Sequence, residues 1–361
     1  MLASRPGNVF PGGGNNLSGR NIMSVRSISV SLVALATGAL TAVPAGADEI
    51  VLKSGTALIR TQSLTHTFLQ ISEEISKEAK GRLRINYLGG PEVTPPGKAG
   101  DALKRGVLDL LHGPASYYNG VIPETDALLV AERSAEELRA NGGWALIEKL
   151  WAEKLNARIL GWYEIGFQAA KDAPQLDLYN LYVTRKPAMD PATGISLKGF
   201  KMRTTATYRA LLNALGATPV AMKASEIYTG LQRGVVQGFG FPGVSISALG
   251  LTGVVKYRID PGFYKGNNLV LANLDKWKAL PKDLRDLIEK RFHEGELRSR
   301  IYVAADARKE EAALVKGGMQ IVTLEGKGAE AYRKLAYDLI WRRLEKRAPA
   351  NAKALAAKFR K

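Results

Sequence analysis

The apolar residues in the N-terminal half of the chain follow the spacing of helices in some segments and that of strands in others. In the segment 64–75, apolar side chains recur at intervals of four, three and four residues, which places them on one face of a helix. A second helix is predicted over 99–105. Short apolar or alternating runs, which are typical of strands, occur at three places: 50–53, 83–87 and 107–111. Strand–helix–strand units of this size predict right-handed crossovers and a parallel sheet.

A second set of α/β elements is predicted from residue 178 onward. A strand at 178–184 is followed by helices at 208–215 and 225–232, and glycine follows each of these helices. The segment 283–316 reads as one long helix between a proline and a pair of glycines. No repeat or low-complexity linker separates the two sets. We therefore expect two α/β lobes between which the chain crosses more than once.

Ligands of parallel sheets gather at the carboxyl ends of the strands. The candidate loops are therefore 55–58, 113–120 and those that follow the later strands. The motif G-x-G-x-x-G at 238–243 fits a dinucleotide fingerprint in letters only, because Pro242 and two phenylalanines occupy its variable positions. No hydrolase motif is present, and the chain contains no cysteine, so a thiolate metal site and a cysteine nucleophile are excluded.

The first 47 residues have the layout of a secretory signal peptide. Met23 and Arg26 precede a short apolar run at 28–39, and the sequence Ala-Gly-Ala ends at Ala47. The apolar run is too short to span a bilayer. We predict cleavage after Ala47, with residues 1–47 removed and Met23 as an alternative initiator, and we expect the remaining chain in the periplasm.

The basic charge of the chain does not by itself indicate nucleic-acid binding. The formal net charge is +17, and the tail 341–361 contains eight basic residues against one glutamate. The sequence shows neither an aromatic-interleaved basic groove nor a known nucleic-acid-binding module, so we expect a solvated basic helix and no nucleic-acid partner. A positive field of this kind attracts small anions.

Several segments together resemble the solute-binding proteins of tripartite ATP-independent periplasmic (TRAP) transporters. The likeness covers residues 50 to 337 in the family's order. The matching segments are KRGVLDL at 104–110, LKGFKMR at 197–203, LGATPV at 215–220, SEIYTGLQRGVV at 225–236, and NLDKW at 273–277 with LP at 280–281.

The resemblance implies an α/β fold with two lobes, each a mostly parallel sheet flanked by helices, joined by hinge strands and a long helix. Lobe I is expected at 48–177 plus about 268–305, and lobe II at 178–267 plus about 306–361. The family binds a small organic acid and delivers it to a membrane permease driven by an ion gradient. The resemblance implies no catalytic residue and no cofactor. The same fold used as a ligand sensor, or as an enzyme acting on an organic acid, is the alternative.

Arg203 matches the arginine that receives the ligand carboxylate in most members of the family. Its guanidinium is always charged and offers a planar fork that fits a carboxylate. The family's common ligand-facing asparagine is replaced here by Phe241, which is closer to the tryptophan of the keto-acid-binding branch. That branch also holds a cation with a glutamate where this chain has Lys265. We therefore expect no metal, and Lys265 is either a contact for a second acidic group or a solvated lysine.

Four further residues are candidate ligand contacts. Tyr117 and Tyr118 follow the predicted strand at 107–111 and combine an apolar face with a polar tip, although either can equally pack in the core. Thr56 follows the first strand, and Asn180 lies near a polar contact of the family. The ligand is expected to be a mono- or dicarboxylate, with Phe241 and the tyrosines favouring a keto, hydroxy or aromatic acid.

Overall fold

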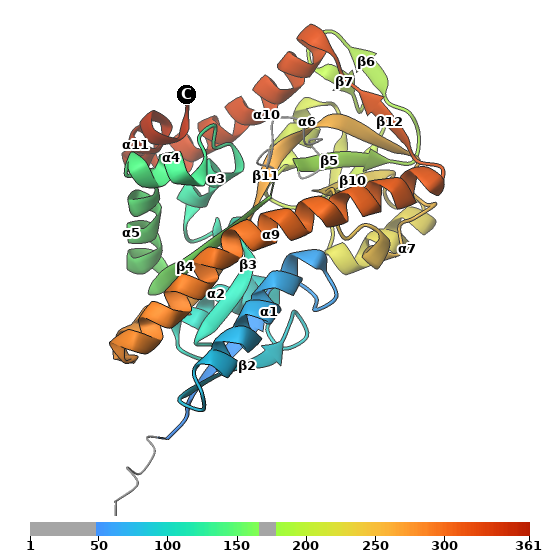
Figure 1. The fold of residues 1–361 in the computed structure, drawn as a ribbon. Coiled ribbons are helices and arrows are strands. Elements are labelled where there is room, and N and C mark those ends of the chain that lie inside the picture. The colour runs from blue at the N-terminus through green and yellow to red at the C-terminus, as the bar shows by residue number, and fades with distance from the viewer. Residues whose placement is uncertain (1–47, 166–177) are drawn as a thin grey trace, which may run out of the picture. The chain divides into compact units, whose positions relative to one another are not determined.

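One long strand, β11 (Tyr257–Asn273), is shared by two sheets, which it joins into a continuous set of ten strands in the described residues. The computed structural model describes residues 48–165 and 178–361, so the predicted signal segment and its cleavage site lie outside the described residues. The second half of β11 pairs with strands from the N-terminal part of the chain, which form the first sheet. The first half of β11 pairs with later strands, which form the second sheet (Figure 1).

The first sheet contains parallel strands at one edge and antiparallel strands around β11. Its members besides β11 are β1 (Ile50–Thr56), β2 (Leu83–Gly89), β3 (Leu110–Pro114) and β4 (Ala157–Ile165). Strand β1 is parallel to both β2 and β3, as the strand–helix–strand pattern predicts. Strand β11 is antiparallel to β3 and β4, because it returns from the second sheet. The sheet is therefore mixed.

The second sheet is mixed in the same way. Its members besides β11 are β5 (Leu178–Val183), β8 (Lys201–Thr204), β9 (Thr218–Ala221), β10 (Gly238–Pro242) and β12 (Gln320–Thr323). Strand β8 is parallel to β9 and β10, and β5 is antiparallel to β10 and β11. A separate hairpin consists of β6 (Ala188–Asp190) and β7 (Gly194–Ser196).

Helices flank both sheets. Those before β5 are α1 (Ser63–Glu78), α2 (Pro96–Lys104), α3 (Asp126–Leu129), α4 (Ala135–Ala140) and α5 (Gly143–Leu155). The later ones are α6 (Arg209–Ala214), α7 (Ile227–Gln232), α8 (Leu274–Ala279), α9 (Lys282–Lys316), α10 (Gly326–Arg347) and α11 (Pro349–Phe359). None of the helices in the described residues is long and apolar enough to cross a membrane.

Helix α9 runs past elements of both sheets (Figure 1). It packs on α1 and β4 along one part of its length and reaches the turn Ser247–Leu249 near its other end. Arg298 of α9 forms an ion pair with Glu74 of α1 at 2.7 Å. Further along, the Glu310 carboxylate accepts a hydrogen bond from the backbone N–H of Ser247 at 2.5 Å. The long helix and β11 therefore both link the two lobes.

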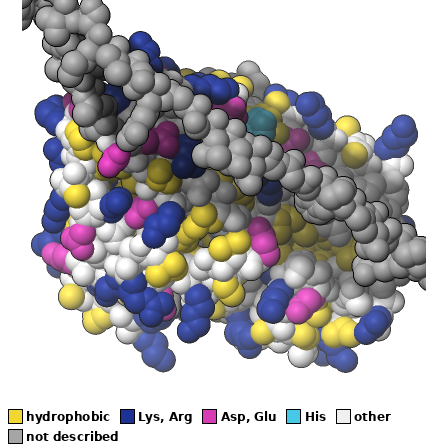
Figure 2. Space-filling view, turned by 90° about the horizontal axis from the view of Figure 1, so that it is seen from below, with side chains coloured by type: hydrophobic (Ala, Val, Ile, Leu, Met, Phe, Trp, Pro, Cys, Tyr) yellow, Lys and Arg dark blue, Asp and Glu magenta, His cyan; other side chains and the backbone are white. Residues whose placement is uncertain are grey.

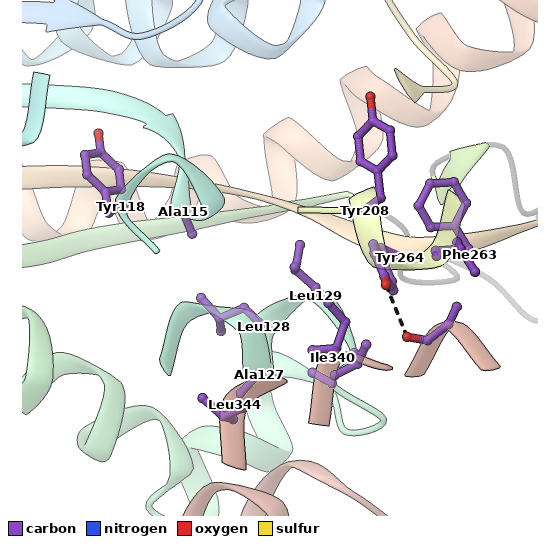
Figure 3. Packing of buried hydrophobic residues seen from close by; sticks show 14 of the residues in the cluster. Ala115, Tyr118, Ala127, Leu128, Leu129, Tyr208, Phe263, Tyr264, Ile340 and Leu344 are labelled. Carbon is purple, nitrogen blue, oxygen red and sulfur yellow. Dashed lines mark hydrogen bonds between the residues drawn. The ribbon is translucent and has the colours of Figure 1, made fainter. Parts of the chain in front are cut away.

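The largest hydrophobic cluster also spans both lobes. Figure 3 shows Ile340 and Leu344 of α10 beside Leu128 of α3, and all three are almost fully buried. The same cluster includes Met202 of β8, and the Tyr264 hydroxyl of β11 donates a hydrogen bond to the carbonyl of Ala336 at 3.1 Å. Helix α10 thus packs against both α3 and β11 in this cluster.

The basic C-terminal tail packs against the body of the protein. The Arg343 guanidinium pairs with the buried carboxylate of Asp126 at 2.7 Å, and Arg347 donates to the carbonyl of Asn119 at 2.6 Å. On the face shown in Figure 2, Lys and Arg side chains are scattered among acidic and apolar ones. Helix α11 contacts α3 and α5, although it falls in the range predicted for lobe II. The exact lobe boundaries stay a prediction.

Most predicted elements occur where the sequence pattern places them, but one predicted strand lies three residues further along the chain. Helix α9 begins one residue before the predicted start, and α1 contains the whole predicted apolar face. The strand predicted at 107–111 is instead β3, which begins at Leu110. The backbone N–H of Val107 bonds to the carbonyl of Ala102, and Gly106 has a φ of +70°, so these residues end α2 and leave Val107 54% exposed.

Candidate ligand-binding site

Arg203 is a buried cation at the end of β8. Its side chain is only 5% exposed. Its Nε donates to the carbonyl of Met222 at 2.9 Å, and its Nη1 donates to the Tyr208 hydroxyl at 2.8 Å. Among the described residues no carboxylate forms an ion pair with Arg203, and three of its five N–H groups, on Nη1 and Nη2, have no partner there. Within the described residues, the outer edge of the guanidinium therefore carries no hydrogen-bond partner.

Tyr208 and Gly240 hold this guanidinium in position. The Tyr208 hydroxyl donates to the carbonyl of Gly240 at 2.9 Å and therefore receives the Arg203 N–H as an acceptor. A Cβ on Gly240 would lie 2.9 Å from the Tyr208 ring, so only glycine leaves room for the ring. The G-x-G-x-x-G motif at 238–243 therefore falls on the fully buried strand β10 and not on a nucleotide-binding turn. Its Gly240 accommodates the ring of Tyr208.

Two further tyrosines lie within electrostatic range of Arg203. Burial raises the pKa of Tyr179, the nearby phenols of Tyr117 and Tyr208 raise it further, and the positive charge of Arg203 lowers it. Tyr179 is the second residue of β5, whereas Tyr117 lies in the turn Ala115–Tyr118 after β3. Phenol groups from both lobes thus lie close enough to Arg203 to feel its charge.

A small cavity lies next to these tyrosines where the two lobes meet. Its volume is about 40 Å³, several times the space that one ordered water needs. Its walls come from the loop before α1, the end of β3, and strands β5, β10 and β11. The described residues that line it are Leu58, Gln62, Leu64, Pro114, Ser116, Tyr117, Leu129, Tyr179, Phe241, Pro242, Gly266, Asn267 and Asn268.

Phe241 and Tyr117 both line this cavity; Arg203 is not among the lining residues, but its charge acts on Tyr117 and Tyr179, which are. Phe241 is 9% exposed and lies edge-on to Phe239, with ring centres 6.3 Å apart. Tyr118 points elsewhere, into the core, where its ring meets Trp151 edge-on with ring centres 4.9 Å apart. Adjacent residues in the turn after β3 thus have different surroundings. The loops 55–58 and 113–120, predicted from the strand ends, both contribute to the cavity wall.

Thr56 and Asn180 are not among the residues that line the cavity, and both are bonded within the protein. The Thr56 hydroxyl donates to the carbonyl of Leu58 at 2.6 Å. The Asn180 amide donates to the carbonyl of Ile259 at 3.0 Å and to the carboxylate of Asp260 at 2.8 Å, while its Oδ1 is buried without a partner among the described residues. Both side chains therefore organise backbone close to the site.

Lys265 also lies away from the cavity wall. Its Nζ donates a hydrogen bond to the carbonyl of Ala131. Burial lowers the pKa of Lys265 and raises the pKa of the neighbouring Glu164, and the attraction between the two groups opposes both changes. Glu164 faces Asn267 in the register of β4 and β11. This pair therefore belongs to the strands that join the lobes.

No sequence pattern points to Gln62 or Tyr179, because membership of the cavity depends on how distant segments pack. One signal was available at Asn267 and Asn268. Two adjacent amides come directly before the apolar run 269–272 of β11, in a buried part of the strand where polar residues are unfavourable unless they have a partner. Such a pair marks a strand that faces a polar site.

The chain belongs to the bacterial extracellular solute-binding proteins, family 7, whose family model matches residues 55–346. It is 22% identical over 339 residues to the monocarboxylate 2-oxoacid-binding periplasmic protein of Nostoc sp., covering 88% of this chain and 86% of that protein. It is 23% identical over 280 residues to the C4-dicarboxylate-binding periplasmic protein DctP of Rhodobacter capsulatus, covering 75% and 80%.

The fold is also that of solved TRAP receptors. The crystal structure of a TRAP periplasmic solute binding protein from Desulfovibrio salexigens with bound orotic acid superposes with a TM-score of 0.74. The match has 18% sequence identity and covers 86% of this chain and 97% of that one. The two-lobed α/β fold expected from the sequence is therefore confirmed. The family and its structural neighbours are receptors that bind solutes.

Proposed function

We propose that the protein is the periplasmic receptor of a TRAP transporter and captures a small organic acid through its carboxylate, held by Arg203. The observation that carries this proposal is a buried guanidinium with unpartnered N–H groups and no acidic partner among the described residues. The named relatives and the solved receptor all bind organic acids, which supports the proposal.

The physical argument rests on the cost of burying a charge. A cation that is withdrawn from water is strongly unfavourable unless an anion and hydrogen bonds compensate it. Because Nε and one N–H of Nη1 are already used, a carboxylate can bind across the remaining N–H groups of Nη1 and Nη2 in two parallel hydrogen bonds. The ligand would be held and released unchanged, then passed to the membrane permease.

Removing the guanidinium tests the proposal. We expect Arg203→Ala to weaken the binding of the cognate acid at least a hundredfold, because the loss of one partner of a buried pair costs about 3–5 kcal/mol and ~1.4 kcal/mol is a tenfold change in affinity. Arg203→Lys keeps the charge without the fork and should restore only part of the affinity. Isothermal titration calorimetry measures both.

A matched control is Arg185→Ala. Arg185 lies in the same lobe, stacks on Phe200 at 3.7 Å and donates to the carbonyl of Gly199, but it is exposed and outside the cavity. Its replacement should leave the affinity unchanged. Tight binding of an acid by Arg203→Ala, with the fold intact by circular dichroism, would contradict the proposal.

A further inference from the structure

Gln62 presents an unpartnered amide to the cavity. Its side chain is 5% exposed, and its Oε1 is buried without a hydrogen-bond partner among the described residues. Gln62 precedes α1 at the capping position, but its side chain does not cap the helix. Its backbone is already engaged, since its N–H bonds to the carbonyl of Ile59 and its carbonyl accepts from Thr65. The amide is therefore left for something inside the cavity.

Asn268 contributes a second amide to the cavity wall, from strand β11. It is 2% exposed in β11, facing Pro114 of β3, and its side chain makes no hydrogen bond within residues 48–165 and 178–361. The adjacent Asn267 differs, because its amide donates to the carbonyl of Leu128 at 2.9 Å and accepts from the Trp162 indole at 2.7 Å. Asn267 is thus a structural residue, whereas Asn268 can bond a ligand.

The cavity wall itself carries no formal charge among the described residues, which contribute only amides, hydroxyls and apolar groups. Buried cations elsewhere in the same strand are engaged: Lys265 bonds to the carbonyl of Ala131, and Arg258 pairs with Asp260 at 2.7 Å. Arg203 does not line the cavity, but its charge acts on Tyr117 and Tyr179 of the wall, so we assign the ligand's carboxylate to it. A second carboxylate would be withdrawn from water without a compensating charge, which is unfavourable.

We infer that the protein selects a small monoanionic acid whose other end is neutral and carries hydrogen-bonding groups, such as an amide, lactam, hydroxyl or keto group, and that Gln62 and Asn268 recognise that end. This inference rests on the proposed function, since it assumes that Arg203 holds the carboxylate. It goes further because it decides between monocarboxylates and dicarboxylates. The neutral amides are complementary to a neutral polar group and unfavourable to a second anion.

Matched pairs of ligands test this selection. Malonate, succinate and glutarate are each compared with their own monoamide by calorimetry at pH 7.5, where the diacids carry two charges. We expect each monoamide to bind at least about tenfold more tightly than its diacid, because the diacid leaves a desolvated charge unpaired. Equal or tighter binding of the diacids would overturn the inference.

Substitutions at Gln62 make the test specific to the cavity wall. Gln62→Lys places a cation at the neutral end and should reverse the preference toward the diacid, whereas Gln62→Glu should weaken monoamide and diacid alike. Gln237→Lys, an equal change at a glutamine outside the cavity, should leave the preference as it is. Circular dichroism and melting temperature confirm that each variant is folded.

The outcomes separate the two proposals. A preference that Gln62→Lys leaves unchanged in a folded protein would overturn the role of Gln62. If monoamides and diacids bind equally well and Arg203→Ala abolishes both, the selection is wrong and the proposed function stands. If wild-type protein binds an uncharged sugar and none of the acids, the proposed function fails as well.

Discussion

The Tyr208 hydroxyl occupies a particular place in the site, because it contacts the guanidinium and not the cavity. By donating to the carbonyl of Gly240 it presents its lone pairs to Arg203. This arrangement fixes one N–H of the fork and leaves the outer edge open. The position of the guanidinium thus depends on a hydroxyl that does not itself line the cavity.

Replacing this hydroxyl should reduce affinity without removing the charge. We expect Tyr208→Phe to weaken acid binding about tenfold, because a hydrogen bond to a charged group contributes roughly 1.5–3 kcal/mol, part of which water can replace. The control is Tyr118→Phe, which removes a buried hydroxyl that has no partner among the described residues. It should leave affinity unchanged. Calorimetry on both variants makes the comparison, and equal effects would show that Tyr208 has no special role.

How far the sequence predicts single residues depends on what each prediction requires. The motif at 197–203 singles out Arg203 as a candidate from residue type and neighbours alone, and its role in binding stays a prediction. Tyr117 and Tyr118 could not be distinguished, since one residue of turn geometry decides which ring enters the core. Gln62 was missed because its unpartnered amide becomes visible only when β11 and the loop before α1 are brought together.

At the scale of elements, spacing predicted helices better than strands. The apolar face of α1 and the extent of α9 follow from periodicity and from proline and glycine at their ends. The run 107–111 contains no proline or glycine that would mark a boundary. Its first residue, Val107, bonds to the carbonyl of Ala102 and so belongs to the end of α2. The passage of β11 through both sheets was likewise invisible, because a 17-residue strand with two different sets of partners has no signature in sequence.

Strand β3 carries a buried group that should govern acid stability. His112 is fully buried, lies against Phe68 with ring centres 5.1 Å apart, and has no hydrogen bond on either nitrogen among the described residues. Burial lowers the pKa of His112 to about 3. Between this value and about 6.5, the unfolded chain binds a proton that the folded protein does not, so stability falls as the pH falls.

This pH dependence can be measured against a variant that lacks it. From pH 7 to pH 5, His112 should lower the free energy of unfolding by about 2 kcal/mol, because one unit of pKa difference corresponds to ~1.4 kcal/mol. His112→Phe should lose that part of the decrease, whatever its stability at pH 7. Urea unfolding at both pH values gives the difference. An identical decrease in both proteins would mean that His112 titrates normally in the folded state.

At the scale of the whole molecule, the basic charge should act on the rate of binding. The net charge is +17 for the full chain, and basic side chains are scattered over the face in Figure 2. Such a field accelerates the encounter with an anion, and salt screens it. We expect the association rate of the acid to fall several-fold between low and physiological ionic strength, with little change in its dissociation rate, as measured by stopped-flow fluorescence.

The control reduces charge far from the cavity. Lys346 and Lys353 are exposed on α10 and α11 and make no bond within the described residues. The double variant K346E/K353E should show a shallower salt dependence of the association rate and an unchanged dissociation rate. A salt effect confined to dissociation in both proteins would point to screening within the complex instead.

The shared strand β11 has a consequence for how the molecule loses its structure. Since one continuous backbone supplies hydrogen bonds to both sheets, and α10 lies in a core common to both, melting either sheet strips partners from the other. The two lobes should therefore unfold as a single cooperative unit. A destabilising change at either end of β11 would therefore lower the free energy of unfolding of the whole protein, including the strands that line the cavity.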